Sequence, residues 1–427
     1  MRFPLVALAL VLAAISNTAG AQPAALPPPA ALTLDEAMRL AEAAHPSVLA
    51  RQAQLSAAEG TRREAAAWLF NNPELGTEGI RRRANATGSS WNEWSVGISQ
   101  SFETGGQQAK RREAAAAGLD ALRAEIDDAR RQARVEAATR FLAVLSAQER
   151  VQLEQRSLDL FERSAQAVAK RRAAGEDTRL DANVALVEAE RARNALALAG
   201  ERLIDARSEL GTALRLPPSA LPEVVGNLDN AIDGTLPYRL EQLLASAQSL
   251  PRQRALAARE EAARARLGVE RGSRNPDVTV GVHVGREGPS DGSERLAIVS
   301  LSVPLPLFKR NDAAIGQAMT DMTQAEVERA SALRDTDARV RQLWSRLASQ
   351  RERIKRLQRV LVPASTDNQQ LSAKSREAGQ IGLLDQLIVN RQAIDAERDL
   401  IELLAEMHTT RIELEYAAGW PQQGSSR

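Results

Sequence analysis

Cysteine is absent from this chain of 427 residues, which excludes disulfides, thiolate metal sites, a cysteine nucleophile and a lipid anchor on an N-terminal cysteine. Aromatic residues make up only 3% of the sequence, so a large globular core is not expected. The formal net charge of +1 gives the chain no overall attraction for nucleic acid. No Gly-rich phosphate loop, nucleophile elbow or HExxH spacing occurs. The sequence therefore offers no catalytic residue, no cofactor site and no metal site.

Long hydrophobic runs are missing as well, except at the N-terminus. Residues 1–21 read as a secretory signal, with Arg2 as the positive start, an apolar run over 5–15 and an A-x-A type cleavage site at 19–21. We expect cleavage there, followed by a proline-rich segment over 22–32. After residue 21 no apolar stretch approaches the ~18 residues of a membrane-spanning helix. If the mature chain enters a membrane, it must therefore do so as a β-barrel.

An internal repeat organises the rest of the chain. Asn72-Pro73 matches Asn275-Pro276 at an offset of about 203 residues, and "GEDTRLD" at Gly175 matches "GQIGLLD" at Gly379. The repeat predicts two equivalent halves, residues 33–215 and 236–418, joined by a linker rich in proline and glycine over 216–235. Residues 419–427 form a C-terminal tail. Each half begins with a helix, which Pro46 or Pro251 interrupts.

Two short strands follow the opening helices in each half. Apolar residues alternate there with small or polar ones, which is the pattern of a strand with one apolar face. We expect that face to contact lipid, and its representative residues are Trp94, Val96, Ile98, Val280, Val282 and Leu301. On the opposite, polar face lies His283. Three copies of His283 in a trimer could touch a passing metal ion, but a polar residue on a wet face is the favoured interpretation.

Very long helices follow the strands, over about 107–172 and 312–374. Apolar residues recur there at spacings of three, four and seven, which is typical of coiled coils; in the second helix the seam includes Val340, Leu347, Ile354 and Leu361. Some 65 residues at ~1.5 Å each give a rod of about 100 Å. Pro363 should bend the second rod. Each Gly-x4-Leu-Asp stretch is then the tip of a helical hairpin, and a return helix follows it.

Four strands of about 9–11 residues cannot close a membrane barrel alone. Two chains would supply eight strands and a barrel interior filled by side chains, whereas three would supply twelve and leave a lumen. The fold class predicted is therefore mainly α with a small β part. A conducting barrel needs at least three such chains. In the form expected, each chain gives four strands to a trimeric 12-strand outer-membrane β-barrel, which a long periplasmic α-helical coiled-coil barrel continues.

The plan resembles that of the TolC-like outer-membrane efflux factors over nearly the whole mature chain. The segments "NNPELG", "SQSFETGGQQAKRR" and "LSVPLPLFKRN" look closest to the outer-membrane channels of cobalt–zinc–cadmium-type heavy-metal efflux systems. This resemblance implies a homotrimer in the outer membrane of a Gram-negative bacterium, surrounded by lipid, with a large periplasmic part. It also implies a periplasmic adaptor and an inner-membrane proton-driven pump as partners. The function implied is the export of heavy-metal cations.

The tips resemble the family's tip motif, which implies a contact with the adaptor and a gate at Gly175, Leu180, Asp181, Gly379, Leu384 and Asp385. The glycines are expected to adopt positive φ and end a helix. The two aspartates would either form a ring that attracts cations or simply cap the return helices.

Two alternatives remain open from the sequence. The same channel fold could serve multidrug efflux or type I protein secretion. A soluble periplasmic adaptor or scaffold built on helical hairpins is a further alternative, but it would not need four alternating strands of membrane length.

Overall fold

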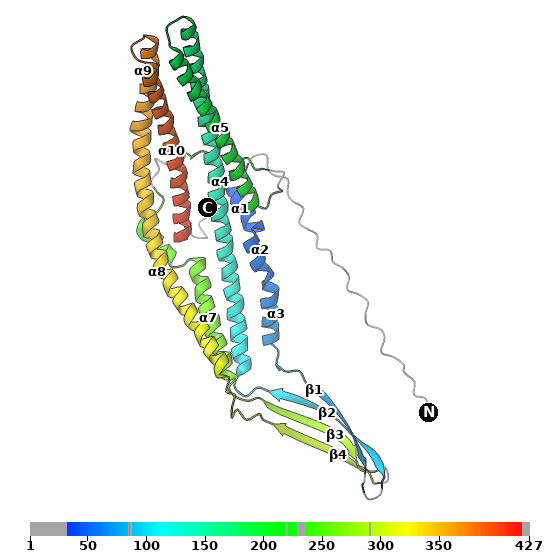
Figure 1. Cartoon of the computed structure of the whole chain (residues 1–427). Coiled ribbons are helices and arrows are strands. Elements are labelled where there is room, and N and C mark those ends of the chain that lie inside the picture. The colour runs from blue at the N-terminus through cyan, green and yellow to red at the C-terminus, as the bar shows by residue number, and fades with distance from the viewer. Residues whose placement is uncertain are drawn as a thin grey trace.

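Two long helical hairpins lie side by side and continue, at their other end, into a four-stranded sheet (Figure 1). The computed structural model describes residues 32–83, 85, 88–217, 221–228, 236–289 and 292–420. The predicted signal sequence, most of the proline-rich segment, part of the linker and most of the C-terminal tail lie outside the described residues.

The same order of elements occurs twice along the chain. The first half contains α1 (Leu34–Ala44), α2 (Pro46–Ala53), α3 (Leu55–Ala65), β1 (Glu74–Arg83), β2 (Ser90–Phe102), α4 (Gln107–Ala173) and α5 (Arg179–Ala213). The second half contains α6 (Leu240–Ala247), α7 (Pro251–Gly272), β3 (Val278–Glu287), β4 (Glu294–Ser302), α8 (Asp312–Arg356), a π-helical turn η2 (Leu357–Leu361), α9 (Val362–Glu377) and α10 (Leu383–Ala418).

Local sequence signals set the helix boundaries. Thr33 caps α1 in a capping box with Glu36. His45 ends α1 and caps α2, so the break before Pro46 is confirmed. The opening helices of the first half end with α3 at Ala65. Among the helices of the described ranges, none has the length and apolar character needed to span a membrane.

All four strands pair antiparallel in the order β1-β2-β3-β4. Ile98 faces Leu75 on β1 and Val282 on β3, and Val282 in turn faces Val299 on β4. Because alternate residues of a strand share a face, this register brings all six representative apolar residues onto one face of the sheet. The predicted alternation is therefore confirmed as a shared apolar face.

The long helices bury the expected seam for most of their length. Val340, Leu347 and Ile354 are almost fully buried in the main core, where α8 packs against α10. The prediction that the buried seam continues to Leu361 is wrong, because this side chain is 47% exposed. The π-helical turn at 357–361 rotates the helix face relative to the heptad pattern. It lies directly before Pro363, whose ring clashes with the carbonyl of a regular preceding turn.

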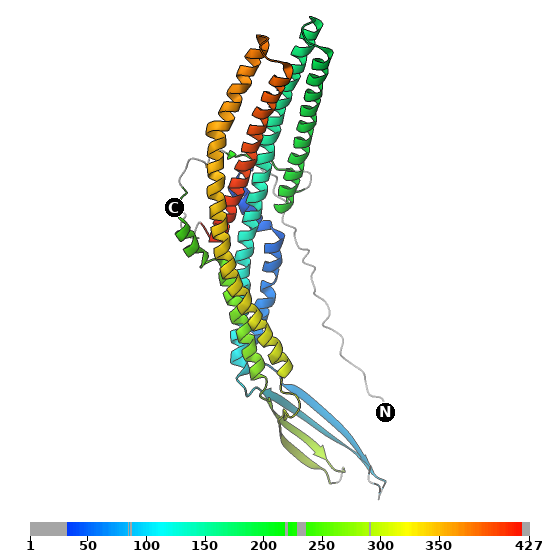
Figure 2. The same ribbon diagram turned by 60° about the vertical axis from the view of Figure 1, so that its left-hand side comes forward.

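The core is divided along the molecule rather than concentrated in one place. The larger cluster lies at mid-length, where α1 and α6 pack against the long helices and the rings of Tyr238, Trp344 and Trp420 meet. A smaller cluster around Phe161 and Leu387 joins the two hairpins nearer their tips. Figure 2 shows the resulting elongated shape, with the hairpin tips and the strand ends at opposite extremes.

Candidate functional site

The two hairpin tips have the same backbone geometry. Gly175 has φ +82° and Gly379 has φ +69°, which confirms the predicted left-handed conformation. At the first tip the amide of Glu176 donates to the carbonyl of Arg171. At the second tip the amide of Gln380 donates in the same way to Ser375. These bonds define a Schellman motif, which ends the helix sharply and turns the chain back.

The two tip aspartates cap the return helices. Asp181 accepts from the Thr178 amide at 3.0 Å while the Asp181 amide donates to the Thr178 hydroxyl, a complete capping box. Asp385 accepts from the Gly382 amide at 3.2 Å. Hydrogen bonds from the side chain and backbone of Thr178 lower the pKa of Asp181 below its usual value. The capping interpretation therefore describes both carboxylates in this structure.

Apolar side chains project beside these caps. Leu180 is 72% exposed and Leu384 is 60% exposed, each one residue before the capping aspartate. Neither belongs to the two apolar core clusters. An exposed leucine at the same position of both tips, on a rigid helix start, is suited to insertion into a partner's apolar groove.

An ion pair that the sequence analysis missed joins the two tips. Arg376 on α9 donates to the carboxylate of Asp177 at 2.6 Å and to the carbonyl of Ile381 at 3.4 Å. The Asp177 side chain is only 4% exposed. We call this contact the tip ion pair. The one available signal was an asymmetry of the repeat, because the position equivalent to Asp177 in the second tip is the apolar Ile381.

Further ion pairs join the hairpins between the tips and mid-length. The buried carboxylate of Glu154 on α4 accepts from Arg398 of α10 at 2.7 Å and from Arg150 at 2.7 Å. Closer to the tips, the buried carboxylate of Glu188 on α5 accepts from Arg391 of α10 at 2.9 Å. Buried carboxylates of this kind persist only with such partners. The hairpins of one chain are thus bound to each other at several levels.

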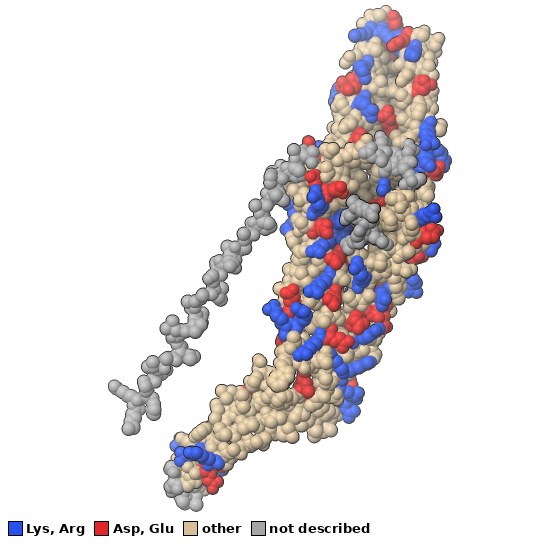
Figure 3. Space-filling model, turned by 180° about the vertical axis from the view of Figure 1, so that it is seen from behind, with Lys and Arg blue, Asp and Glu red and all other residues tan. Residues whose placement is uncertain are grey.

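The two faces of the sheet differ in chemistry. Over the length from Trp94 to Phe102 and the strand positions paired with it, the apolar face carries charge only at the paired Arg286 and Arg295, near the strand tips. Seen from behind, the sheet surface between the helices and the strand tips shows neither acidic nor basic side chains (Figure 3). The opposite face carries serine, glycine and His283. Gly97 lies opposite His283, and a Cβ at Gly97 would come within 2.1 Å of the imidazole ring, so only glycine fits there.

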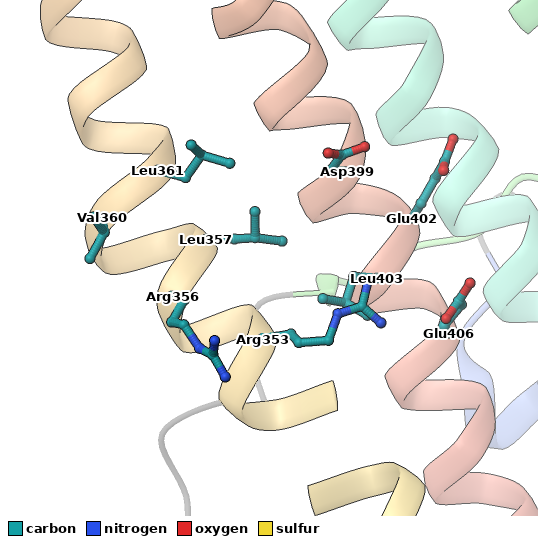
Figure 4. Close-up of a pocket in the computed structure, with 9 residues that line it drawn as sticks. All are labelled: Arg353, Arg356, Leu357, Val360, Leu361, Asp399, Glu402, Leu403 and Glu406. Carbon is teal, nitrogen blue, oxygen red and sulfur yellow. The ribbon is translucent and has the colours of Figure 1, made fainter. Parts of the chain in front are cut away.

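A hollow of about 510 Å³ opens between η2 and α10. Leu357 and Leu361 point from η2 toward α10, whereas Val360 points away (Figure 4). Arg353 and Arg356 line the hollow from α8, and the acids Asp399, Glu402 and Glu406 line it from α10. Its mixed charge resembles a solvated groove between helices. Nowhere in the described part of the chain do three His, Asp or Glu side chains lie close enough together to hold a metal ion.

Comparison with known proteins identifies the family. The model of the family "Outer membrane efflux protein" matches residues 37–214 and 240–420. The chain belongs to this family, and it is an efflux channel of the outer membrane with a large periplasmic part. Members of the family transport without catalysing a reaction, so the protein is not an enzyme.

The relatives agree with this assignment. The cobalt-zinc-cadmium resistance protein CzcC of Cupriavidus metallidurans is 27% identical over 388 residues, covering 91% of this chain and 90% of CzcC. Among solved structures, CusC superposes with a TM-score of 0.76 at 18% identity, covering 90% of this chain and 91% of CusC. The outer-membrane channel OprN gives 0.77 at 19% identity, covering 90% of this chain and 89% of OprN. The fold is thus that of the TolC-like channels, with its long helices and small antiparallel sheet.

Proposed function

We propose that three copies of this chain form a channel that exports heavy-metal cations. Their twelve strands, four from each chain, would close an outer-membrane barrel, and their long helices would continue it as a tube through the periplasm. The two repeats, 33–215 and 236–418, would each contribute one hairpin and two strands to every protomer.

The sheet is the observation that carries this proposal. It has one apolar face, which carries no charge between the helices and the strand tips, and its outer strands β1 and β4 each leave an edge without a partner strand in the described chain. An open edge in the hydrocarbon layer would leave backbone groups unpaired at several kcal/mol each, so the edges must meet those of other chains. Three chains are the smallest number that also leaves a lumen. In this arrangement Trp94, Ile98 and Val282 face lipid and His283 faces the lumen.

The substrate follows from similarity rather than from a metal site. CzcC, whose name refers to cobalt, zinc and cadmium resistance, matches this chain almost from end to end. We therefore propose metal cations as cargo, delivered by an inner-membrane proton-driven pump through a periplasmic adaptor. The exposed Leu180 and Leu384 would be the adaptor contact, and the tip ion pair would hold the resting gate closed.

Deletion of the gene in its host, with complementation by the intact chain, tests this function. We expect loss of tolerance to zinc, cobalt or cadmium and recovery on complementation, with little change in tolerance to a panel of drugs. Copper is included as a further metal. If only drug tolerance falls, multidrug efflux replaces metal export; if both are unchanged and an exported protein accumulates inside the cell, type I secretion does.

A further inference from the structure

The acidic and basic residues of the four strands are separated between the two faces of the sheet. The acids all lie on the face that carries His283: Glu74, Glu78, Glu93, Glu287 and Glu294. The arginines lie on the apolar face, with the exception of Arg82: Arg81, Arg83, Arg286 and Arg295. We call these four residues the outer arginine patch. Basic side chains gather at the strand tips, where the uncharged surface of the sheet ends (Figure 3).

The arginines of the two faces also differ in their partners. Arg82 donates to the buried carboxylate of Glu93 at 2.8 Å and to the carboxylate of Glu287 at 2.9 Å. Within the described ranges, no acid pairs with any member of the outer arginine patch, and all four side chains are exposed. The patch makes one side-chain hydrogen bond in that part of the chain, from Arg286 to the hydroxyl of Ser293 at 2.7 Å. Its positive charge is therefore not compensated by the described residues.

Two members of the patch lie directly opposite each other. Arg286 on β3 pairs with Arg295 on β4, and Trp94 on β2 pairs with Arg286 from the other side. Like charges at directly opposite positions of neighbouring strands destabilise a sheet. An anion between the two guanidinium groups removes this repulsion, and the planar guanidinium group is suited to bind phosphate through two parallel hydrogen bonds. The patch is therefore suited to a partner that carries phosphate.

The patch lies where the apolar face of the sheet ends. From Phe102 to Trp94 the strand rises about 27 Å at ~3.4 Å per residue, which is roughly 20 Å along the axis of a barrel with strands tilted by ~40°. This length fills most of the ~25 Å apolar band of an outer-membrane barrel. Arg286 and Arg295 are level with Trp94, and the other two members lie closer to the strand tips. Because the helices leave the opposite end of the sheet, the patch lies at the outer leaflet of the membrane.

We propose that the outer arginine patch binds the phosphate groups of lipopolysaccharide, the lipid of the outer leaflet, and forms a binding site for this lipid around the outer rim of the channel. This inference rests on the proposed barrel and adds a specific anionic lipid to the contact of its apolar face with hydrocarbon. In the trimer, β4 of one chain would lie beside β1 of the next, so Arg295 of one chain would meet Arg81 and Arg83 of its neighbour. Acids on this face would repel the phosphates, which accounts for their restriction to the other face.

Native mass spectrometry of the full-length channel, purified in detergent, tests this proposal by measuring its affinity for three lipids. These are phosphorylated lipid A, lipid A from which the phosphates have been removed, and phosphatidylglycerol. The test variant combines Arg286→Gln with Arg295→Gln, which removes the two opposed charges from the patch. The control variant combines Arg334→Gln with Arg346→Gln, which removes the same charge from two exposed positions of α8, outside the sheet.

We expect the wild-type channel and the control variant to bind phosphorylated lipid A more tightly than either other lipid. The test variant should lose roughly 10- to 30-fold in affinity for it, because each arginine beside an anionic membrane surface contributes about fivefold. Unchanged affinity in the test variant, or equal affinity of the wild type for lipid A without phosphates, would overturn the proposal.

Two further outcomes are distinguishable from these. If phosphatidylglycerol binds as tightly as phosphorylated lipid A and is lost in the same variant, the patch accepts any anionic lipid, and its assignment to lipopolysaccharide is overturned. Trimer abundance in outer-membrane fractions, judged on gels with and without heating, is measured for every variant. Absence of the trimer in the wild type would reject the barrel itself, whichever lipid is bound.

Discussion

Substitution by arginine at two neighbouring positions of β2 should have opposite effects on assembly of the channel. Ile98 and Ser99 are adjacent in sequence and at the same depth in the sheet, but they lie on opposite faces. Ile98 is central in the uncharged part of the apolar face and is flanked by Leu75 and Val282. Ser99 is flanked by Glu74 and by Gly281, which has no side chain, so an arginine there has both room and a carboxylate partner.

The size of the difference follows from membrane energetics. Arginine on the lipid face of an outer-membrane barrel costs about 2–4 kcal/mol near the middle of the bilayer. Each 1.4 kcal/mol is a factor of ten, so Ile98→Arg should lower the equilibrium constant for folding of each chain into the membrane roughly 30- to 700-fold relative to wild type. The proposed trimer contains three such chains, so the penalty for its assembly is about 6–12 kcal/mol. Ser99→Arg should avoid this penalty, since its guanidinium would face the lumen of the proposed barrel.

Trimer abundance in outer-membrane fractions, judged on gels with and without heating, measures the outcome, and metal tolerance by growth accompanies it. We expect no trimer for Ile98→Arg and near-normal trimer for Ser99→Arg. Growth of the Ser99→Arg strain in metal reports separately on conduction, because a cation in the lumen can oppose cation flow without affecting assembly. Equal loss of trimer for both variants, or equal tolerance of both, would refute the assignment of the faces.

Three predictions concern the tips. Gly175→Val forces a β-branched residue into φ +82°, at about 1–2 kcal/mol, and should abolish metal tolerance while trimer abundance stays unchanged. The control is Gly316→Val, inside α8 with open space around it, which should keep both metal tolerance and trimer abundance. Asp177→Ala removes the buried carboxylate that faces Arg376 and Arg171, at about 3–5 kcal/mol, and should raise single-channel conductance in bilayers; unchanged conductance would remove the tip ion pair from the gate. The pKa of Asp181 is lowered, so the stability that its cap contributes is complete above the ordinary aspartate pKa and is lost as pH falls through the lowered pKa. Amide hydrogen exchange at the start of α5 should therefore become faster only in acid. Exchange that becomes faster near neutral pH would contradict this prediction.

Much of the fold could be predicted because its signals are local. Apolar residues recur at every second position along β2 and β3, and this pattern predicts an apolar face of each strand without any knowledge of the strand that pairs with it. The observed register then brings Ile98, Val282 and Leu301 onto one face of the sheet. Positive φ at Gly175 follows in the same way from the few residues around a helix end. These features depend on neighbours within a turn or two.

What could not be predicted depends on contacts between distant residues. The tip ion pair joins Asp177 to Arg376, 199 positions apart, and both residues sit among other charged residues that look equally able to pair. The loss of the seam at Leu361 has a different cause. A single π-helical turn shifts all later positions of a heptad, and neither the spacing of apolar residues nor Pro363 reveals where the extra residue is placed.

The buried ion pairs also bear on why the first half of the repeat packs against the second half rather than against another first half. Two halves of one plan could in principle associate first with first and second with second, either within a chain or between chains. The buried acids Glu154, Asp177 and Glu188 all belong to the first half. Each binds one arginine of the second half (Arg398, Arg376 and Arg391) and one arginine of its own half (Arg150, Arg171 and Arg191).

The second half has no acid at the positions equivalent to these three. At the positions equivalent to the three acids, 203 or 204 residues later, the second half has Leu357, Ile381 and Gln392. A pairing of two first halves would leave each of these carboxylates with only the arginine of its own half, and a pairing of two second halves would leave Arg398, Arg376 and Arg391 without these buried carboxylates. The exposed pairs Arg150–Glu402 and Arg156–Glu397 run in the opposite direction, but water screens them and they contribute little. Divergence at three buried positions therefore favours contact of the first hairpin with the second over contact between two copies of the same hairpin.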